Sequence, residues 1–305
     1  MMWLFLTLSV GFTACAGAPL ILTPYIESGN IQEARNLALV TQLSPNLESY
    51  SAFLTVDKQC DTNLYFWFFP SQNDWLNDPI ILWLQGGPGL SSMKGLLQEH
   101  GPYALTDTQE LILREYTINR NSSVIYMDNP AGSGFSYSTY ECYDEDEVTP
   151  VEKIHKALHQ FFVLFPEISE NSFYIAGEGY AGKFAILLAF DNYISENKTF
   201  NFQGLIIGNG AIDPSEAFEV SDYLYQVGVA DDLSVFLAKY YAEDVTRFCN
   251  DLDYDDASDY YQERYLKVID DATHFSDLNN LLYGDGEPLV EIESFLELPQ
   301  VCTVL

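Results

Sequence analysis

The sequence has few basic residues. Its 305 residues contain 13 Lys and Arg against 45 Asp and Glu, which gives a formal net charge of −32. Nucleic acids and anionic membrane surfaces are bound through basic patches, so we expect neither as a partner. An acidic compartment would protonate many carboxyl groups and reduce their repulsion. The charge therefore suits secreted or lysosomal surroundings, and it is equally compatible with simple solubility.

The hydrophobic run at the start of the chain is too short to span a bilayer. It extends from Trp3 to Phe12, and Ala14-Cys15-Ala16 follows it as a small-x-small cleavage pattern. We therefore interpret residues 1–16 as a secretory signal peptide, despite the lack of Lys and Arg before the run. This predicts a protein of the secretory pathway, secreted or lysosomal.

Cysteine is sparse, with five residues in the chain. Signal cleavage would remove Cys15 and leave an even number, which in an exported protein predicts disulfides with three possible connectivities. The remaining cysteines are Cys60, Cys142, Cys249 and Cys302. Asn121 and Asn197 each begin an N-x-S/T pattern, so both are predicted glycosylation sites.

A recognisable metal motif is also lacking. His155 and His159 stand four residues apart, but no H-E-x-x-H pattern accompanies them. The aspartates that follow Asp251 suggest a calcium loop, yet Asp256 and Gln262 occupy the positions that need glycine and glutamate. We therefore expect no metal and no other cofactor.

Short apolar runs separated by turns predict an α/β fold. A β-hairpin is expected first, and four further strands and two helices follow. The hairpin covers residues 49–56 and 63–69, the other strands 80–84, 124–127, 172–176 and 204–208, and the helices 151–165 and 183–193. The charge run Asp144–Glu147 is expected to be a solvated loop. Beyond Pro214 the sequence becomes helical, aromatic and acidic, which indicates an insertion or cap over the sheet.

Glycine-rich loops follow three of the predicted strands, at residues 85–92, 128–137 and 177–182. Ligands of open α/β sheets bind at such strand ends. The third loop lies between a strand and a helix, as in the G-x-S-x-G nucleophile elbow of serine hydrolases. Its middle position is Gly179 rather than serine. The chain thus has the strand, turn and helix of a nucleophile elbow but lacks the serine hydroxyl group.

Five ordered motifs resemble the serine carboxypeptidases (peptidase S10). They are Trp83–Ser92 (WLQGGPGLSS), Glu99–Pro102 (EHGP), Asp128–Tyr137 (DNPAGSGFSY), Gly177–Gly182 (GEGYAG), and Gly208-Asn209-Gly210 with Asp213-Pro214. Together they cover residues 45–215. The opening Pro24-Tyr25-Ile26-Glu27, Gln85 and Ser91-Ser92-Met93 look most like the vitellogenic carboxypeptidase-like branch.

The resemblance implies an α/β-hydrolase fold and a family that removes C-terminal residues from peptides with a Ser-Asp-His triad. The positions that would bind the terminal carboxylate of the substrate are Gln85, Gly86, Glu99 and Glu178. A glutamic acid in that role must hold a proton, because like charges so close cannot both ionise. Gly87 and Tyr180 would supply the backbone N–H groups of the oxyanion hole.

Two departures from the family pattern concern catalysis. Gly179 occupies the position of the family serine, and a hydrogen cannot attack a carbonyl group. The triad Asp and His, which follow the serine in chain order, are expected to be missing because the sequence is truncated. The expected division is a core at residues 17–214, a helical insertion at 215–290 and a truncated return to the core at 291–305.

These features support three hypotheses. The leading one is a catalytically inactive carboxypeptidase homologue whose pocket still binds peptide or protein C-termini. An active carboxypeptidase, represented here by a fragment or variant, is the first alternative. An acidic secreted protein with a binding or structural role is the second. Missing strands would also expose a sheet edge and promote self-association.

Overall fold

The computed structural model describes residues 18–41, 43, 47–106, 108–196, 198–212, 219–274 and 292–296. The predicted signal peptide, Asn197, the Asp213-Pro214 motif and Cys302 lie outside this part. The chain divides into two compact units. A core unit contains Thr7–Gly210 and Val290–Leu305, and a helical unit contains Ala211–Leu289.

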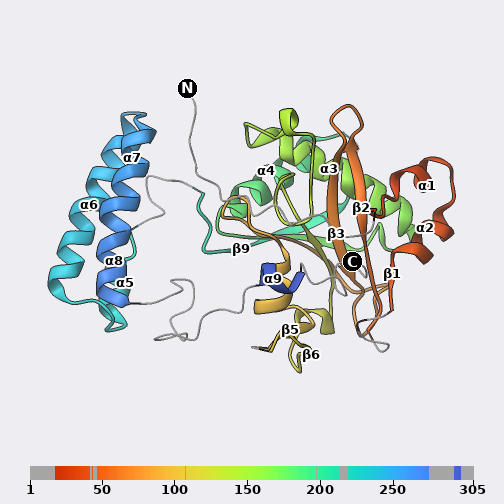
Figure 1. The fold of residues 1–305 in the computed structure, drawn as a ribbon, viewed down its shortest axis with the longest axis horizontal. Coiled ribbons are helices and arrows are strands. Elements are labelled where there is room, and N and C mark those ends of the chain that lie inside the picture. Colours follow the sequence, from red (N-terminus) through yellow and green to blue (C-terminus); the bar gives the residue numbers. More distant parts are fainter. Residues whose placement is uncertain are drawn as a thin grey trace. The chain divides into compact units, whose positions relative to one another are not determined.

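A mixed seven-stranded sheet organises the described part of the core unit (Figure 1). Its strand order is β1-β2-β3-β7-β4-β8-β9. Pairing is antiparallel from β1 to β7 and parallel from β7 through β4 and β8 to β9. The strands are β1 (Leu39–Val40), β2 (Ser49–Asp57), β3 (Thr62–Phe69), β4 (Ile80–Leu84), β7 (Ser123–Met127), β8 (Ser172–Glu178) and β9 (Asn201–Gly208).

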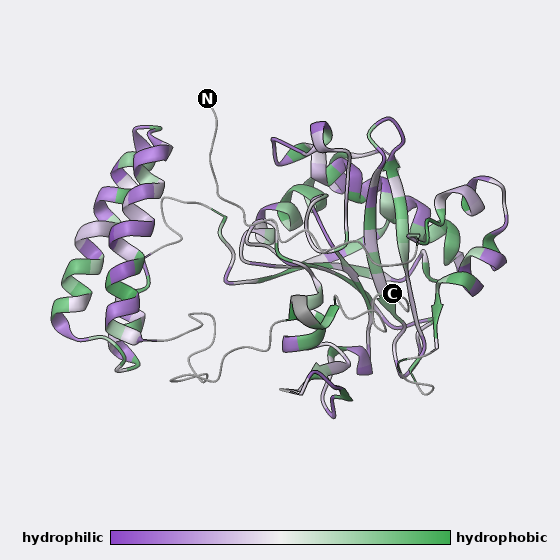
Figure 2. Cartoon of the chain, in the orientation of Figure 1, coloured by the Kyte–Doolittle hydropathy of each residue, from purple (hydrophilic) through white to green (hydrophobic). Residues whose placement is uncertain are grey.

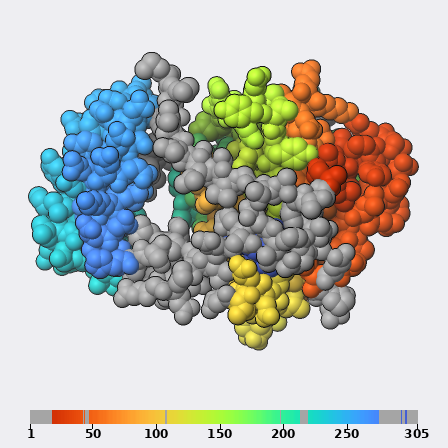
Figure 3. Space-filling view, viewed as in Figure 1, coloured from red at the N-terminus to blue at the C-terminus, as the bar shows by residue number. Residues whose placement is uncertain are grey.

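Side chains of alternate strand residues build two separate hydrophobic layers, because neighbouring residues of a strand point to opposite faces. Phe66 and Phe68 of β3 lie in the layer that helices α3 and α4 cover. Those helices span Val148–Leu164 and Ala181–Ile194. Helices α1 (Thr23–Glu27) and α2 (Ile31–Ala38) contact α3, and the red segment that contains them packs beside the green segment that includes α3 (Figure 3).

Trp67 and Phe69 of β3 point to the other face of the sheet. There they pack with Leu96 and Leu97 and with Phe295. The elements of this side are the π-helix η1 (Gly95–Glu99), the hairpin β5 (Tyr103–Leu105) and β6 (Leu111–Leu113), the 3₁₀-helix η2 (Ile118–Arg120) and α9 (Ile292–Leu296). This layer holds η1 against β4, directly beside the glycine-rich loops.

The predicted hairpin, the four further strands and the two core helices are all present, so the α/β prediction is confirmed. Most of them differ from the expected ranges by one to three residues at an end; the second helix, for example, begins at Ala181 rather than at residue 183. The short elements α1, α2, β1, β5 and β6 were not expected. Strands of two or three residues carry too little alternation to be recognised from sequence.

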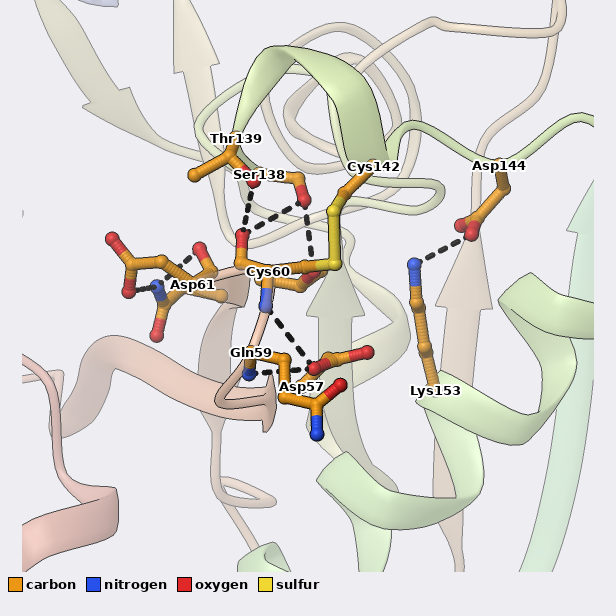
Figure 4. Close-up of a disulfide and its surroundings, with 11 residues drawn as sticks. Asp57, Gln59, Cys60, Asp61, Ser138, Thr139, Cys142, Asp144 and Lys153 are labelled. Carbon is orange, nitrogen blue, oxygen red and sulfur yellow. Dashed lines mark hydrogen bonds and ion pairs between the residues drawn. A yellow bond between two sulfur atoms is a disulfide. The ribbon is translucent and has the colours of Figure 1, made fainter.

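The prediction that the charge run Asp144–Glu147 is a solvated loop was wrong for Asp144. Its side chain is 4% exposed, and its Oδ1 lies 2.5 Å from the Nζ of Lys153 in α3 (Figure 4). The ammonium group of Lys153 compensates the buried negative charge of Asp144. Local polarity alone does not predict such a pairing. Asp146 has a structural role as well, because its Oδ1 accepts the N–H groups of Val148 and Thr149 at the start of α3.

A disulfide joins Cys60 to Cys142, with a Cα–Cα distance of 5.8 Å (Figure 4). Disulfides were expected, and this pair is one that the spacing left open. It connects the β2–β3 turn to the 3₁₀-helix η3 (Tyr140–Cys142). Ser138 and Thr139 donate hydrogen bonds to the carbonyl oxygen of Cys60 and fix the same junction.

Strand β9 is the outermost strand of the sheet within the described residues. Leu205 and Ile206 are 40% and 45% exposed, and Phe190 and Tyr193 of the neighbouring α4 are also exposed. Self-association through this edge stays a prediction.

The helical unit contains α5 (Ser221–Gln226), α6 (Asp232–Asn250), α7 (Tyr254–Tyr260), the π-helix η5 (Tyr261–Tyr265) and α8 (Leu266–Thr273). Hydrophobic and hydrophilic patches are visible on α6 and α8 (Figure 2). Leu224, Ala238, Tyr265 and Ile269 pack together in its core. The aspartate-rich segment after residue 250 is helical from Tyr254 onward. Its role as a cap over the sheet stays a prediction.

Candidate active site

The elbow joins β8 to α4 through Gly179. This glycine has φ = +58°, a left-handed conformation that glycine adopts without steric cost. Its N–H donates to the carbonyl oxygen of Gly208 at 3.0 Å, and its own carbonyl oxygen accepts the N–H of Gly182 at 3.1 Å. The predicted strand, sharp turn and helix are thus present, with glycine at the apex.

The loop after β4 lies directly against this elbow. A Cβ atom on Gly86 would lie 2.2 Å from the backbone nitrogen of Ala181. A Cβ atom on Gly179 would lie 2.7 Å from the carbonyl oxygen of Gly86. Both distances are shorter than side-chain contacts allow, and backbone atoms stand on the other side. A serine at position 179 would therefore require this loop to move.

A chain of hydrogen bonds crosses the strand ends. Trp83 donates through Nε1 to Oε1 of Gln85 at 2.9 Å, and Gln85 donates through Nε2 to Oε2 of Glu178 at 2.7 Å. Gln85 is 2% exposed, and its backbone N–H donates to Oγ of Ser92. The amide group of Gln85 is consequently fixed in one orientation, with its nitrogen toward the elbow.

Glu99, at the end of η1, belongs to the same cluster. Burial, the charge of Glu178 and a hydrogen bond between the two carboxyl groups raise the pKa of Glu99 to about 7. Nearby Lys94 acts in the opposite direction and lowers this pKa. Glu99 therefore holds its proton under acidic conditions. Three side chains predicted to bind a carboxylate, Gln85, Glu99 and Glu178, come together from three separate segments.

Lys94 was missed by the sequence argument. Its Nζ lies 3.5 Å from Oε1 of Glu99 and 3.8 Å from Oε1 of Glu178. Lys94 directly precedes η1, in which hydrogen bonds join residues five apart, so residues 94 and 99 come nearly above one another. On an α-helix the same spacing would separate them, so helical periodicity did not indicate this contact.

Asp128 fixes the second glycine-rich loop to the first. It is fully buried and accepts hydrogen bonds from Ser91 Oγ, the Ser92 N–H and the Phe135 N–H. Burial raises the pKa of Asp128 to about 6, and these three donors counteract the shift. The motif residue thus has a structural role: it sets the position of the loop that contains Gly86 and Gly87.

Tyr180 is fixed from the outer side of the elbow. Its hydroxyl donates to Oε1 of Glu147 at 2.9 Å. The ammonium group of Lys183 lies 3.5 Å from the same carboxylate oxygen and 4.7 Å from the centroid of the Tyr180 ring. Burial, followed by Glu147, raises the pKa of Tyr180, so its phenol stays neutral. The charge run before α3 therefore also stabilises the elbow.

The remaining candidate residues lie apart from the cluster or beside it. His100 stacks on Tyr126 and contacts Trp83 edge-on, and burial lowers its pKa to about 4. His155 lies against Phe200, with its Nε2 2.9 Å from Asp191. Asn121 is exposed after η2. Glycosylation of Asn121 and Asn197 stays a prediction.

Within the described ranges, no group of three or more His, Cys, Asp or Glu side chains is arranged to hold a metal ion. The helices of the same ranges include none that is long and apolar enough to cross a bilayer.

The sheet, its covering helices and the elbow define the α/β-hydrolase fold, as predicted. The solved structure of a prohormone-processing carboxypeptidase from Saccharomyces cerevisiae has this fold and matches with a TM-score of 0.68. The alignment is 22% identical and covers 88% of this chain and 66% of that one.

The chain belongs to the serine carboxypeptidase family, whose profile matches residues 40–280. The vitellogenic carboxypeptidase of Aedes aegypti is 38% identical in an alignment of 303 positions that covers 94% of this chain and 63% of that protein. The venom serine carboxypeptidase of Apis mellifera is 46% identical over 71% of this chain and 47% of its own length. The probable serine carboxypeptidase CPVL of Homo sapiens is 44% identical with the same coverages. The chain thus spans about half to two thirds of these relatives, and the family prediction is confirmed.

Proposed function

We propose that this chain binds the C-terminal residue of peptides or proteins through the Gln85–Glu99–Glu178 cluster and does not cleave them. The observation that carries the proposal is the 2.7 Å hydrogen bond from Gln85 to Glu178, which joins two of the predicted carboxylate-binding side chains beside an elbow without a nucleophile. Its neighbour Glu99, with a pKa of about 7, can donate its proton to a peptide carboxylate in acid.

The inactive state is supported by the identity and the surroundings of residue 179. Loss of the triad serine lowers turnover by on the order of 10⁶ in a well-studied protease. Here the Gly86 carbonyl oxygen also occupies the space beside Gly179 that a Cβ atom would need. The N–H groups of Gly87 and Tyr180 belong to the main chain, so they remain available when the serine side chain is absent. They are proposed to donate hydrogen bonds to a carbonyl group of the bound peptide.

A place in the secretory pathway, secreted or lysosomal, is part of the proposal. The predicted signal peptide supports it, and so does the Cys60–Cys142 disulfide, since such bonds persist in oxidising compartments. A raised Glu99 pKa also suits an acidic lumen.

Gln85→Ala is expected to weaken peptide binding about tenfold or more, because it removes a hydrogen-bonded amide beside a charged group. Binding of an N-acylated dipeptide and of its C-terminal amide would be measured by calorimetry on the whole chain at pH 5. The unmodified chain should bind the free acid more tightly than the amide.

Gln203→Ala is the matched control, because Gln203 is an exposed residue of β9 whose side chain bonds to Asn201. It should bind both ligands as the unmodified chain does. Equal affinity for acid and amide, or a Gln85→Ala variant that binds normally, would contradict the proposal and favour the hypothesis of an acidic structural protein.

A further inference from the structure

Lys94 places a fixed positive charge inside the carboxyl cluster. Its side chain is 18% exposed, and those of Glu99 and Glu178 are 26% and 14% exposed. The ammonium group contacts both carboxyl groups, at 3.5 and 3.8 Å. All three are therefore partly shielded from water, where charges interact more strongly than on an open surface.

The position of Lys94 is set by tight packing around η1. The backbone N–H of Lys94 donates to the carbonyl oxygen of Ser91 at 3.1 Å. The next residue, Gly95, approaches Trp83 so closely that a Cβ atom would lie 2.4 Å from the indole nitrogen. That same nitrogen bonds to Gln85. The backbone position of Lys94 is thus set by the same elements that orient the Gln85 amide and the neighbouring carboxyl groups.

The charge balance of the cluster depends on Lys94. Two carboxyl groups alone accept an incoming carboxylate only when both are protonated, because any remaining negative charge repels it. With Lys94 present, one proton on the pair is enough, since the ammonium group cancels the other negative charge. The cluster then offers a neutral, donor-rich surface over a wider pH range.

The surrounding groups do not titrate in the same range. His100 has its pKa lowered to about 4 by burial and is neutral at pH 5 and above. Burial raises the pKa of Tyr126, so its phenol is also neutral. Arg114 is charged throughout, and its guanidinium group donates to the carbonyl oxygens of Leu97 and Tyr103. A change of binding near neutral pH would therefore originate at Glu99.

We propose that Lys94 is a specificity-determining residue: its charge lets the site accept a peptide C-terminal carboxylate when Glu99 alone carries a proton. This inference rests on the proposed function. It names the ligand group that Lys94 selects, a free carboxylate rather than an amide, and the condition under which the selection matters.

The test compares Lys94→Met with Lys58→Met on the whole chain. Lys58 is an exposed lysine that pairs with Glu27, so its replacement makes the same change in net charge away from the site. Affinities for an N-acylated dipeptide and its C-terminal amide are measured at pH 6, below the Glu99 pKa of about 7. The unmodified chain and Lys58→Met should prefer the acid. Lys94→Met should lose about tenfold or more of this preference.

Lys94→Arg provides a second variant that retains the charge, and it should prefer the acid at pH 6. A Lys94→Met variant that prefers the acid as strongly as the unmodified chain would overturn the inference while leaving the proposed function intact. So would an equal weakening of acid and amide binding by a variant with native thermal stability. Failure of the unmodified chain to prefer the acid at pH 5 would instead reject the proposed function itself.

Discussion

Gly86→Ala is expected to lower the free energy of unfolding by more than about 3 kcal/mol and to abolish peptide binding. The added Cβ atom would lie 2.2 Å from the nitrogen of Ala181 and 2.9 Å from the carbonyl carbon of Tyr180. Both are backbone atoms of the elbow, so no side chain can rotate away. Urea denaturation and peptide binding would measure the two effects.

Gly204→Ala is the matched control in the same sheet. A Cβ atom on Gly204 would lie 3.4 Å from the nearest atoms of the Tyr174 ring, which is an ordinary contact. The substitution should change stability by less than about 1 kcal/mol. If Gly86→Ala were no more damaging than this control, the close approach of the two loops would be wrong.

Removing the Cys60–Cys142 disulfide is expected to destabilise the core unit by about 4 kcal/mol. The bond closes a loop with a sequence separation of 82 residues, so it restricts the unfolded chain strongly. Denaturation of the Cys60→Ser/Cys142→Ser double variant against the oxidised chain would measure the loss.

Each single cysteine variant serves as the control, because losing either sulfur atom breaks the bond. Both should lose about as much stability as the double variant. Losses that add up instead would mean that the two side chains act separately, which contradicts a disulfide between them.

Much of the sheet could be predicted because its strands are short apolar runs bounded by turns. Ile80–Leu84 is a continuous apolar run, and the structure buries all of it between parallel neighbours. The glycine motifs predicted the loops as well, since Gly86 and Gly179 stand where backbone segments approach too closely for a side chain. Local sequence carries this information directly.

Lys94 and Asp144 could not be predicted, because their environments depend on helix geometry and side-chain contacts that residue type does not indicate. The position of Lys94 depends on a π-helix, and the burial of Asp144 depends on Lys153 in the following helix. The same is true of the cysteine pair, for which spacing allowed several partners. In each case the missing information was a structural contact that the local sequence pattern does not encode.

The central claim is that this chain binds a peptide C-terminus and leaves the peptide intact. It is tested most directly by incubating the whole chain with an N-acylated dipeptide at pH 5 and measuring binding and release of the C-terminal amino acid in one sample. We expect bound, intact peptide and a turnover lower by on the order of 10⁶ than that of a serine-dependent relative. Release of the amino acid that a serine-directed inhibitor abolishes would contradict the claim.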